Sequence, residues 1–311
     1  PQPFRRPLPE PDRVAAARAV MAHNSSIESF RDALVAAIHW LDENGIDTRP
    51  TRFNAYLKSL NTAIDNDMVA DPASPLFEQV LEALDSGGEL VYIHRHLNTV
   101  NTVAMKDRLR NYCKGTMLER DESAMSSSNR ARNFGFELVF AATLQRAGFN
   151  VEFPAQGDIQ LSSPDVRVEC KRPQKNHKIH SALSDANLQL RARPEAESAV
   201  NIIAVAIGKS IHGGSKLLTA IDPDHAKHDI GLRLDRLIGD HQHIWQTTKF
   251  KAVAAIWFFY SGVVAFTKHN MFTRGTYDRI VVRPDGQHPE REAVIRIIAA
   301  PIENSPGLEV F

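Results

Sequence analysis

Apolar residues recur at helical spacing through roughly the first hundred positions, with few of the alternations that mark a strand. Pro75 follows a serine, which is a common start of a helix, and this pattern predicts a helix that ends near Leu84. A glycine pair at 87–88 is expected to separate it from another helix over about 89–112. The pattern therefore predicts an all-helical N-terminal domain over residues 1–115.

The spacing changes after a polar stretch at 116–129, which is rich in small residues and is typical of a linker. We expect a strongly apolar helix at 134–147, then strands at about 149–153, 158–161 and 166–171, a helix at 180–193, a strand at 199–207, two strands over 252–266 that meet at Ser261-Gly262, and a strand at 279–282. Helices mixed with strands predict a C-terminal α/β domain over residues 130–311, with a mixed sheet flanked by helices.

Residues 158–171 have the pattern of a β-hairpin. Apolar and polar residues alternate on each side of a turn at Ser163-Pro164. Folding about this turn places Gln160 opposite Arg167 and, by the same count, Asp158 opposite Glu169. The hairpin therefore brings two carboxylates together on one face.

Two facing carboxylates repel each other unless a cation lies between them. Mg²⁺ prefers hard oxygen ligands and is often held by one or two carboxylates, with water and phosphate at its other positions. Lys171 lies two residues beyond Glu169 on the same side of the strand, where it could orient or deprotonate an attacking water. Asp158, Glu169 and Lys171 are therefore candidates for a metal-dependent catalytic site.

This arrangement resembles the PD-(D/E)XK motif of the restriction-endonuclease-like nucleases, on Asp158 and the triplet Glu169-Cys170-Lys171. The resemblance implies a restriction-endonuclease-like fold and metal-dependent hydrolysis of phosphodiester bonds in nucleic acid. The family favours DNA as the substrate, and nothing in the residues excludes RNA. It implies that Asp158, Glu169 and the backbone carbonyl of Cys170 bind Mg²⁺ or Mn²⁺ and that Lys171 is catalytic. The chain departs from the literal pattern, since Asp165 follows the proline of the motif; spacing and face favour Asp158, with Asp165 as the alternative.

The resemblance covers about residues 130–210 and adds two candidates. Members of the family commonly carry an acidic residue on the helix before the hairpin, and Glu137 fits as a metal-binding and catalytic residue. A carboxylate in such an apolar helix is costly unless it is paired, and Arg132 or Arg146 could be its partner instead. Some subgroups place a glutamine on the helix after the lysine, and Gln189 is the nearest match.

A basic segment follows the hairpin, although the chain as a whole has a net charge of zero, from 37 basic and 37 acidic residues. Phosphate binding needs such a local basic surface. Asp185 is the acidic residue of this segment, and His177 and His180 could add to its charge. The candidate nucleic-acid-binding residues are Arg172, Lys175, Lys178, Gln189, Arg191 and Arg193.

Composition narrows the class of protein. The two cysteines, Cys113 and Cys170, cannot form a disulfide framework, and the proline-rich start lacks the apolar core of a signal peptide, so we expect a cytoplasmic protein. Histidine clusters such as His241-Gln242-His243 lack a zinc-ligand spacing. The leading hypothesis is a DNA nuclease that could act as a homodimer. Two alternatives stay open: a non-catalytic nucleic-acid-binding module, and a protein-interaction scaffold that acts through the helical domain.

Overall fold

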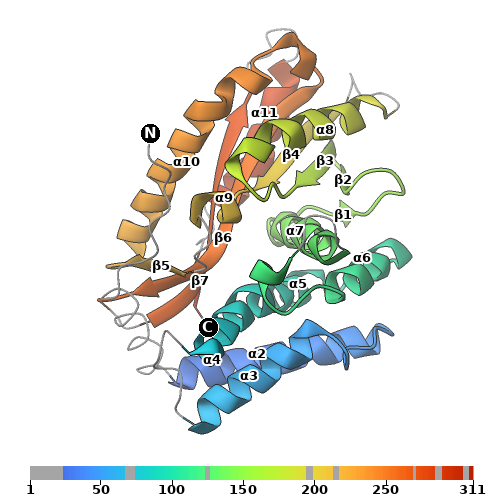
Figure 1. Cartoon of the computed structure of the whole chain (residues 1–311). Coiled ribbons are helices and arrows are strands. Elements are labelled where there is room, and N and C mark those ends of the chain that lie inside the picture. The colour runs from blue at the N-terminus through green and yellow to red at the C-terminus, as the bar shows by residue number, and fades with distance from the viewer. Residues whose placement is uncertain are drawn as a thin grey trace.

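A computed structural model describes residues 24–66, 74–122, 127–193, 199–212, 217–268, 271–283, 289–303 and 308–310. An N-terminal helical region is followed by a mixed sheet flanked by helices, which confirms the predicted fold class at this level (Figure 1). None of the helices within these ranges is long and apolar enough to cross a membrane.

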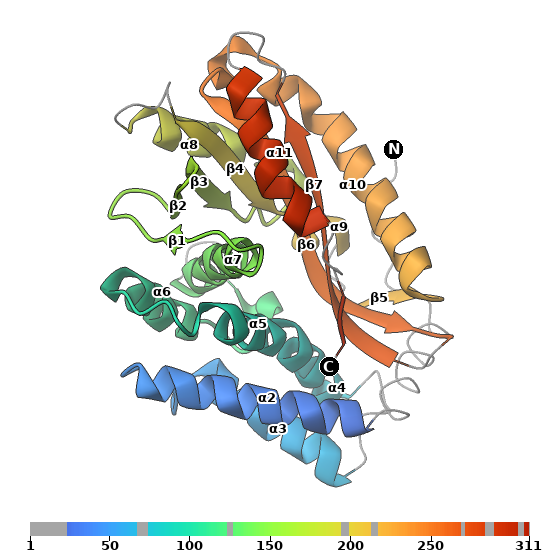
Figure 2. The same ribbon diagram turned by 180° about the vertical axis from the view of Figure 1, so that it is seen from behind.

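The helical region stacks its helices beneath the sheet, with α7 between them and the strands (Figures 1 and 2). Buried side chains of these helices and of the sheet form one continuous hydrophobic core, so the two parts of the chain pack as a unit. The helices are α2 (Asn24–Glu43), α3 (Arg52–Asn66), α4 (Pro75–Glu82), α5 (Gly88–Leu97), α6 (Val103–Cys113) and α7 (Ser127–Arg146).

Two predictions in this region were wrong. The glycine pair at 87–88 does not end a helix, because a π-helical turn (Ala83–Gly87) joins α4 to α5 without a break. Gly87 faces α2, since a Cβ at this position would lie 3.4 Å from the Phe30 ring, at the edge of ordinary van der Waals contact. The expected helix over 89–112 is two helices, because Thr102 caps a new start by accepting a hydrogen bond from the Met105 N–H at 3.2 Å.

The sheet has the order β1-β2-β3-β4-β6-β7-β8, and β5 pairs with the C-terminal part of β6 beside the end of β4. β3, β4 and β6 are parallel in its centre, and antiparallel pairs lie on either side. The strands are β1 (Val151–Glu152), β2 (Ile159–Ser162), β3 (Asp165–Lys171), β4 (Val200–Ala206), β5 (Leu217–Ala220), β6 (Val253–Phe266), β7 (Met271–Val282) and β8 (Leu308–Val310).

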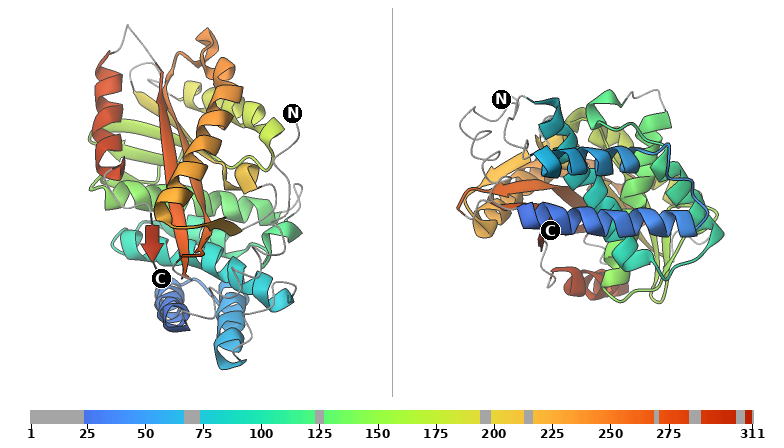
Figure 3. Two further views of the ribbon diagram at one scale, coloured as in Figure 1. Left: turned by 90° about the vertical axis from the view of Figure 1, so that its left-hand side faces the viewer. Right: turned by 90° about the horizontal axis from the view of Figure 1, so that it is seen from below.

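Helices cover both faces of this sheet (Figures 2 and 3). Successive residues of β4 alternate between two cores: Ile202 packs with α7, and Ile203 packs on the opposite face. A central parallel strand is buried on both faces, which explains its continuous apolar run. α11 (Pro289–Glu303) shares the face of α7, whereas α8 (Ile179–Arg191), α9 (Gly208–His212) and α10 (Pro223–Trp245) cover the other.

The prediction of two strands over 252–266 was also wrong. β6 runs without interruption through Ser261 and Gly262, because β7 pairs with it from Ala255 to Phe266. Gly262 lies opposite Gly275, so a glycine that resembled a turn residue in the sequence belongs to a long two-stranded ladder.

Candidate functional site

The hairpin of β2 and β3 carries the site. Gln160 pairs with Arg167 across the ladder, as the alternation predicted, and the turn at Ser163-Pro164 joins the strands. Asp158 lies one residue before β2, and its Oδ2 accepts a hydrogen bond from the Cys170 N–H at 2.6 Å. The backbone of β3 therefore holds the Asp158 carboxylate next to the strand position of Glu169.

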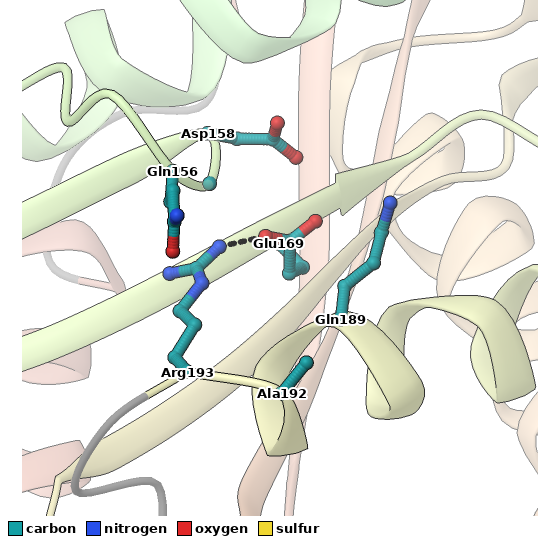
Figure 4. Close-up of a pocket in the computed structure, with 7 residues that line it drawn as sticks. Gln156, Asp158, Glu169, Gln189, Ala192 and Arg193 are labelled. Carbon is teal, nitrogen blue, oxygen red and sulfur yellow. Dashed lines mark hydrogen bonds and ion pairs between the residues drawn. The ribbon is translucent and has the colours of Figure 1, made fainter.

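Asp158 and Glu169 line the same cavity, which has a volume of about 260 Å³ (Figure 4). The cavity lies between the start of β2, the middle of β3 and the end of α8, so three elements supply its wall. A space of this size admits a cation with its water, or a phosphate group. Its lining residues are Gln156, Gly157, Asp158, Glu169, Gln189, Ala192 and Arg193.

Glu169 is a buried carboxylate, with 2% of its surface exposed. Lys171 Nζ lies 3.2 Å from its Oε2, and the guanidinium of Arg193 forms an ion pair with its Oε1. A buried charge is tolerated when it is paired, and here two cations balance one carboxylate. Burial lowers the pKa of Arg193 from its ordinary value, and the nearby Asp158 charge opposes this effect.

Lys171 is also held from the side of α8. Its Nζ donates a hydrogen bond to Gln189 Oε1 at 2.6 Å, while 19% of its side chain stays exposed. The ammonium is thus fixed between an acidic residue of its own strand and an amide of the following helix. Gln189, predicted as a nucleic-acid contact, is in this structure a partner of the candidate catalytic lysine.

Gly157 shapes the turn that precedes Asp158. Its φ is +100°, in the left-handed region that favours glycine. A Cβ at this position would overlap the guanidinium of Arg193, 1.7 Å from Nη2. Glycine therefore serves twice here, since it permits the turn and lets Arg193 reach Glu169.

Glu137 lies on α7 and forms an ion pair with an arginine of α6. Its Oε2 lies 3.1 Å from Nε of Arg108, so the alternative that Arg132 or Arg146 pairs with Glu137 was wrong. Arg132 instead pairs with Glu82 and Glu122. Burial raises the pKa of Glu137 to about 7, and the negative charge of Asp158 adds to the effect, although Arg108 opposes it.

The basic segment divides into two groups. Arg172 is largely buried and paired with Glu119 and Glu122, so it faces the helical region and not the solvent. Arg193 is held at Glu169 inside the cavity. The exposed members are Lys175, Lys178 and Arg191, with His177 and His180 beside them.

The two remaining candidate residues, Asp165 and Cys170, have side chains outside the cavity wall. Asp165 is exposed at the turn end of β3, where its Oδ1 lies 3.5 Å from Gln160 Nε2. Burial raises the pKa of the Cys170 thiol well above its usual range, so its side chain stays neutral and its carbonyl is the atom that could bind a cation. Within the described residues, no group of three or more His, Cys, Asp or Glu side chains could hold a metal ion.

Comparison with models of protein families, with curated proteins and with solved structures finds no match to this chain. The candidate site therefore stands on the geometry of the cavity and on the residues that the alternation of the hairpin indicated.

The sequence analysis missed Gln156, Gly157 and Ala192 of the cavity wall, and Arg108 beside it. Gly157 carried a usable signal, because a glycine next to a polar strand start often marks a left-handed turn. Gln156 has no distinguishing neighbour in the sequence. Arg108 lies 29 residues before Glu137, and nothing in its helical surroundings sets it apart from the other arginines of that region.

Proposed function

We propose that this protein is a metal-dependent nuclease with a PD-(D/E)XK-type site, on a restriction-endonuclease-like arrangement of sheet and helices. The observation that carries the proposal is the shared cavity of Asp158 and Glu169, with Lys171 hydrogen-bonded to Glu169 beside it.

The donor set suits a magnesium ion. Two carboxylates reach the cavity, and a cation of this kind takes its remaining oxygens from backbone carbonyls, water and substrate phosphate. Asp158 uses Oδ2 to accept the Cys170 N–H, which orients the other oxygen of this carboxylate. Lys171 and Arg193 both pair with Glu169, so a cation bound to this carboxylate would replace Arg193 there.

The bound metal would lower the pKa of a water ligand and neutralise the charge that develops on the phosphate. Asp158 and Glu169 would hold the cation at the open end of the β2–β3 hairpin, away from its turn. Lys171 would orient the attacking water or stabilise the phosphate oxygen, with its direction fixed by Gln189. Glu137, with a pKa of about 7, would hold a proton near Asp158.

The proposed substrate is a nucleic acid, and DNA in particular by the family resemblance. Lys175, Lys178 and Arg191 are exposed on the loop before α8 and at the end of this helix, which also supplies the cavity with Gln189. A phosphate backbone that lies across these cations would lead one phosphate to the cavity.

Cleavage of a supercoiled plasmid, of single-stranded DNA and of RNA tests the proposal, with Mg²⁺, Mn²⁺ or a chelator added. The wild-type chain is expected to cut DNA only with metal. Lys171→Ala is expected to lower the rate by about 100-fold or more, because general acid–base groups contribute factors of this order. Glu169→Gln should have a comparable effect, since an amide oxygen binds the cation weakly.

Lys58→Ala is the control, because Lys58 is an exposed lysine of α3. Salt-sensitive DNA binding without cleavage under any metal would instead support the non-catalytic binding module. An absence of both binding and cleavage would contradict the proposal and favour a scaffold that acts through the helical region.

A further inference from the structure

Arg108 connects the helical region to the candidate site. It lies on α6, and 13% of its side chain is exposed. Its Nη2 donates to the carbonyl oxygens of Gly157 at 3.0 Å and of Asp158 at 3.2 Å, while its Nε donates to Glu137. One guanidinium therefore joins α6, α7 and the turn that carries Asp158.

The surroundings keep this guanidinium in place. Its Nη1 donates to the Ala104 carbonyl at 3.3 Å, one turn back on α6, and the ring of Phe153 lies 4.9 Å from Cζ. The planar fork of arginine can satisfy several acceptors at fixed angles, which the single ammonium of lysine cannot do. The turn before β2 lies outside the strand ladder, because β2 begins at Ile159.

We propose that Arg108 is a positioning residue, which holds the backbone of Gly157 and Asp158 so that the Asp158 carboxylate faces the cavity. The proposal builds on the nuclease function above. It assigns the helical region a part in the site itself, since α6 supplies the residue that fixes a metal-binding carboxylate of the sheet domain.

The two possible roles of Arg108, as a positive charge and as a positioning residue, predict opposite changes in metal affinity when Arg108 is removed. If Arg108 acted only as a positive charge, its removal would strengthen the binding of a cation at Asp158 and Glu169. If it positions Asp158, its removal weakens this binding, because residues that orient metal ligands typically contribute about 10- to 100-fold in affinity.

The first measurement is the affinity of the full chain for Mn²⁺, from the electron paramagnetic resonance signal of the free ion. We expect Arg108→Gln and Arg108→Lys to weaken Mn²⁺ binding by about tenfold or more. Arg110→Gln is the matched control, because Arg110 is exposed on the same helix and pairs locally, with Asp107. Unchanged or tighter binding in both Arg108 variants would overturn the proposal.

The second measurement needs neither metal nor substrate. The Cys170 amide is protected by the Asp158 carboxylate, so hydrogen exchange at this amide reports whether Asp158 stays in place. We expect faster exchange at Cys170 in the Arg108 variants, relative to the Ile203 amide of central strand β4, and no such change in Arg110→Gln. Arg108→Lys keeps the positive charge beside Glu137, which guards against simple failure to fold.

The two measurements separate the two proposals. If the wild-type chain binds no Mn²⁺ and cleaves no nucleic acid, the proposed function fails, and selective exchange at Cys170 still decides the role of Arg108. If Cys170 exchanges in the Arg108 variants as it does in Arg110→Gln, Arg108 does not position Asp158, whatever the outcome for the nuclease.

Discussion

At the scale of single residues, burial has the largest effect on the pKa of Glu137. Glu137 lies in an apolar helix with 8% of its surface exposed, and its ion pair with Arg108 does not outweigh the loss of water around the carboxylate. The pKa of Glu137 is therefore raised from 4.5 to about 7. A neighbouring negative charge on Asp158 acts in the same direction.

This shift predicts how stability depends on pH. The folded state binds more protons at Glu137 than the unfolded state between about pH 4.5 and pH 7, so the stability contributed by this residue falls as the pH rises through this window. Glu137→Gln should therefore become more stable relative to wild type as the pH rises, by about 1 kcal/mol or more across the window. Urea unfolding in the presence of a chelator, at several pH values, measures this difference. A difference that stays constant with pH would contradict the raised pKa.

At the scale of the element, the hairpin was predictable because its information is local. The alternation of apolar residues and the turn at Ser163-Pro164 fix the register, and a slip of one residue would turn Glu169 towards the α7 core. The turn before β2 depends instead on Gly157. Its positive φ is a property of the turn, whereas its closeness to Arg193 depends on a residue that follows α8.

Two glycines with positive φ allow the cost of the backbone conformation to be separated from the cost of displacing Arg193. Gly148 follows α7 with a φ of +92° and has nothing within 4 Å of an added Cβ, whereas a Cβ at Gly157 meets Arg193. We expect Gly148→Ala to cost about 1–2 kcal/mol, from the backbone conformation alone. Gly157→Ala should cost at least about 1 kcal/mol more, because Arg193 must leave its place beside Glu169. Equal losses in urea unfolding would show that the approach of Arg193 adds nothing.

At the scale of the molecule, buried charges and a shared core join the helical region to the sheet. Arg132 on α7 lies 3.2 Å from Glu82 of α4 and 3.2 Å from Glu122, and all three side chains are at most 3% exposed. Glu122 in turn pairs with Arg172 at the end of β3 and with Lys209 of α9. Glu122, which precedes α7, is thus paired with the helical region on one side and with residues of the sheet and α9 on the other.

Removal of the central cation should destabilise the whole chain. Arg132→Met leaves Glu82 and Glu122 without the guanidinium that balances them, at a cost of about 3 kcal/mol. Because one core spans both regions, we expect a single urea transition that shifts equally in far-ultraviolet circular dichroism and in tryptophan fluorescence. Arg296→Met, at an exposed i,i+4 pair with Glu292, should change stability by less than about 0.5 kcal/mol. Separate transitions for the two probes would contradict the shared core.

The sequence by itself determined the kinds of element and the face on which Glu169 and Lys171 lie, because the periods of helix and strand repeat over neighbouring residues. It also indicated the hairpin, the apolar helix before it and the buried central strand. It misjudged glycines at 87–88 and 262, since a glycine can end an element or allow close packing, and only the neighbouring element decides which.

Only the tertiary structure decided which charges meet at the site. Arg108 is separated from Asp158 by 50 residues, and Arg193 from Glu169 by 24, and no local pattern specifies such pairs. They depend on how α6, α7 and α8 pack against the sheet, which is set by the apolar core as a whole. The same packing turned Arg172 towards the helical region and left Lys175, Lys178 and Arg191 at the surface.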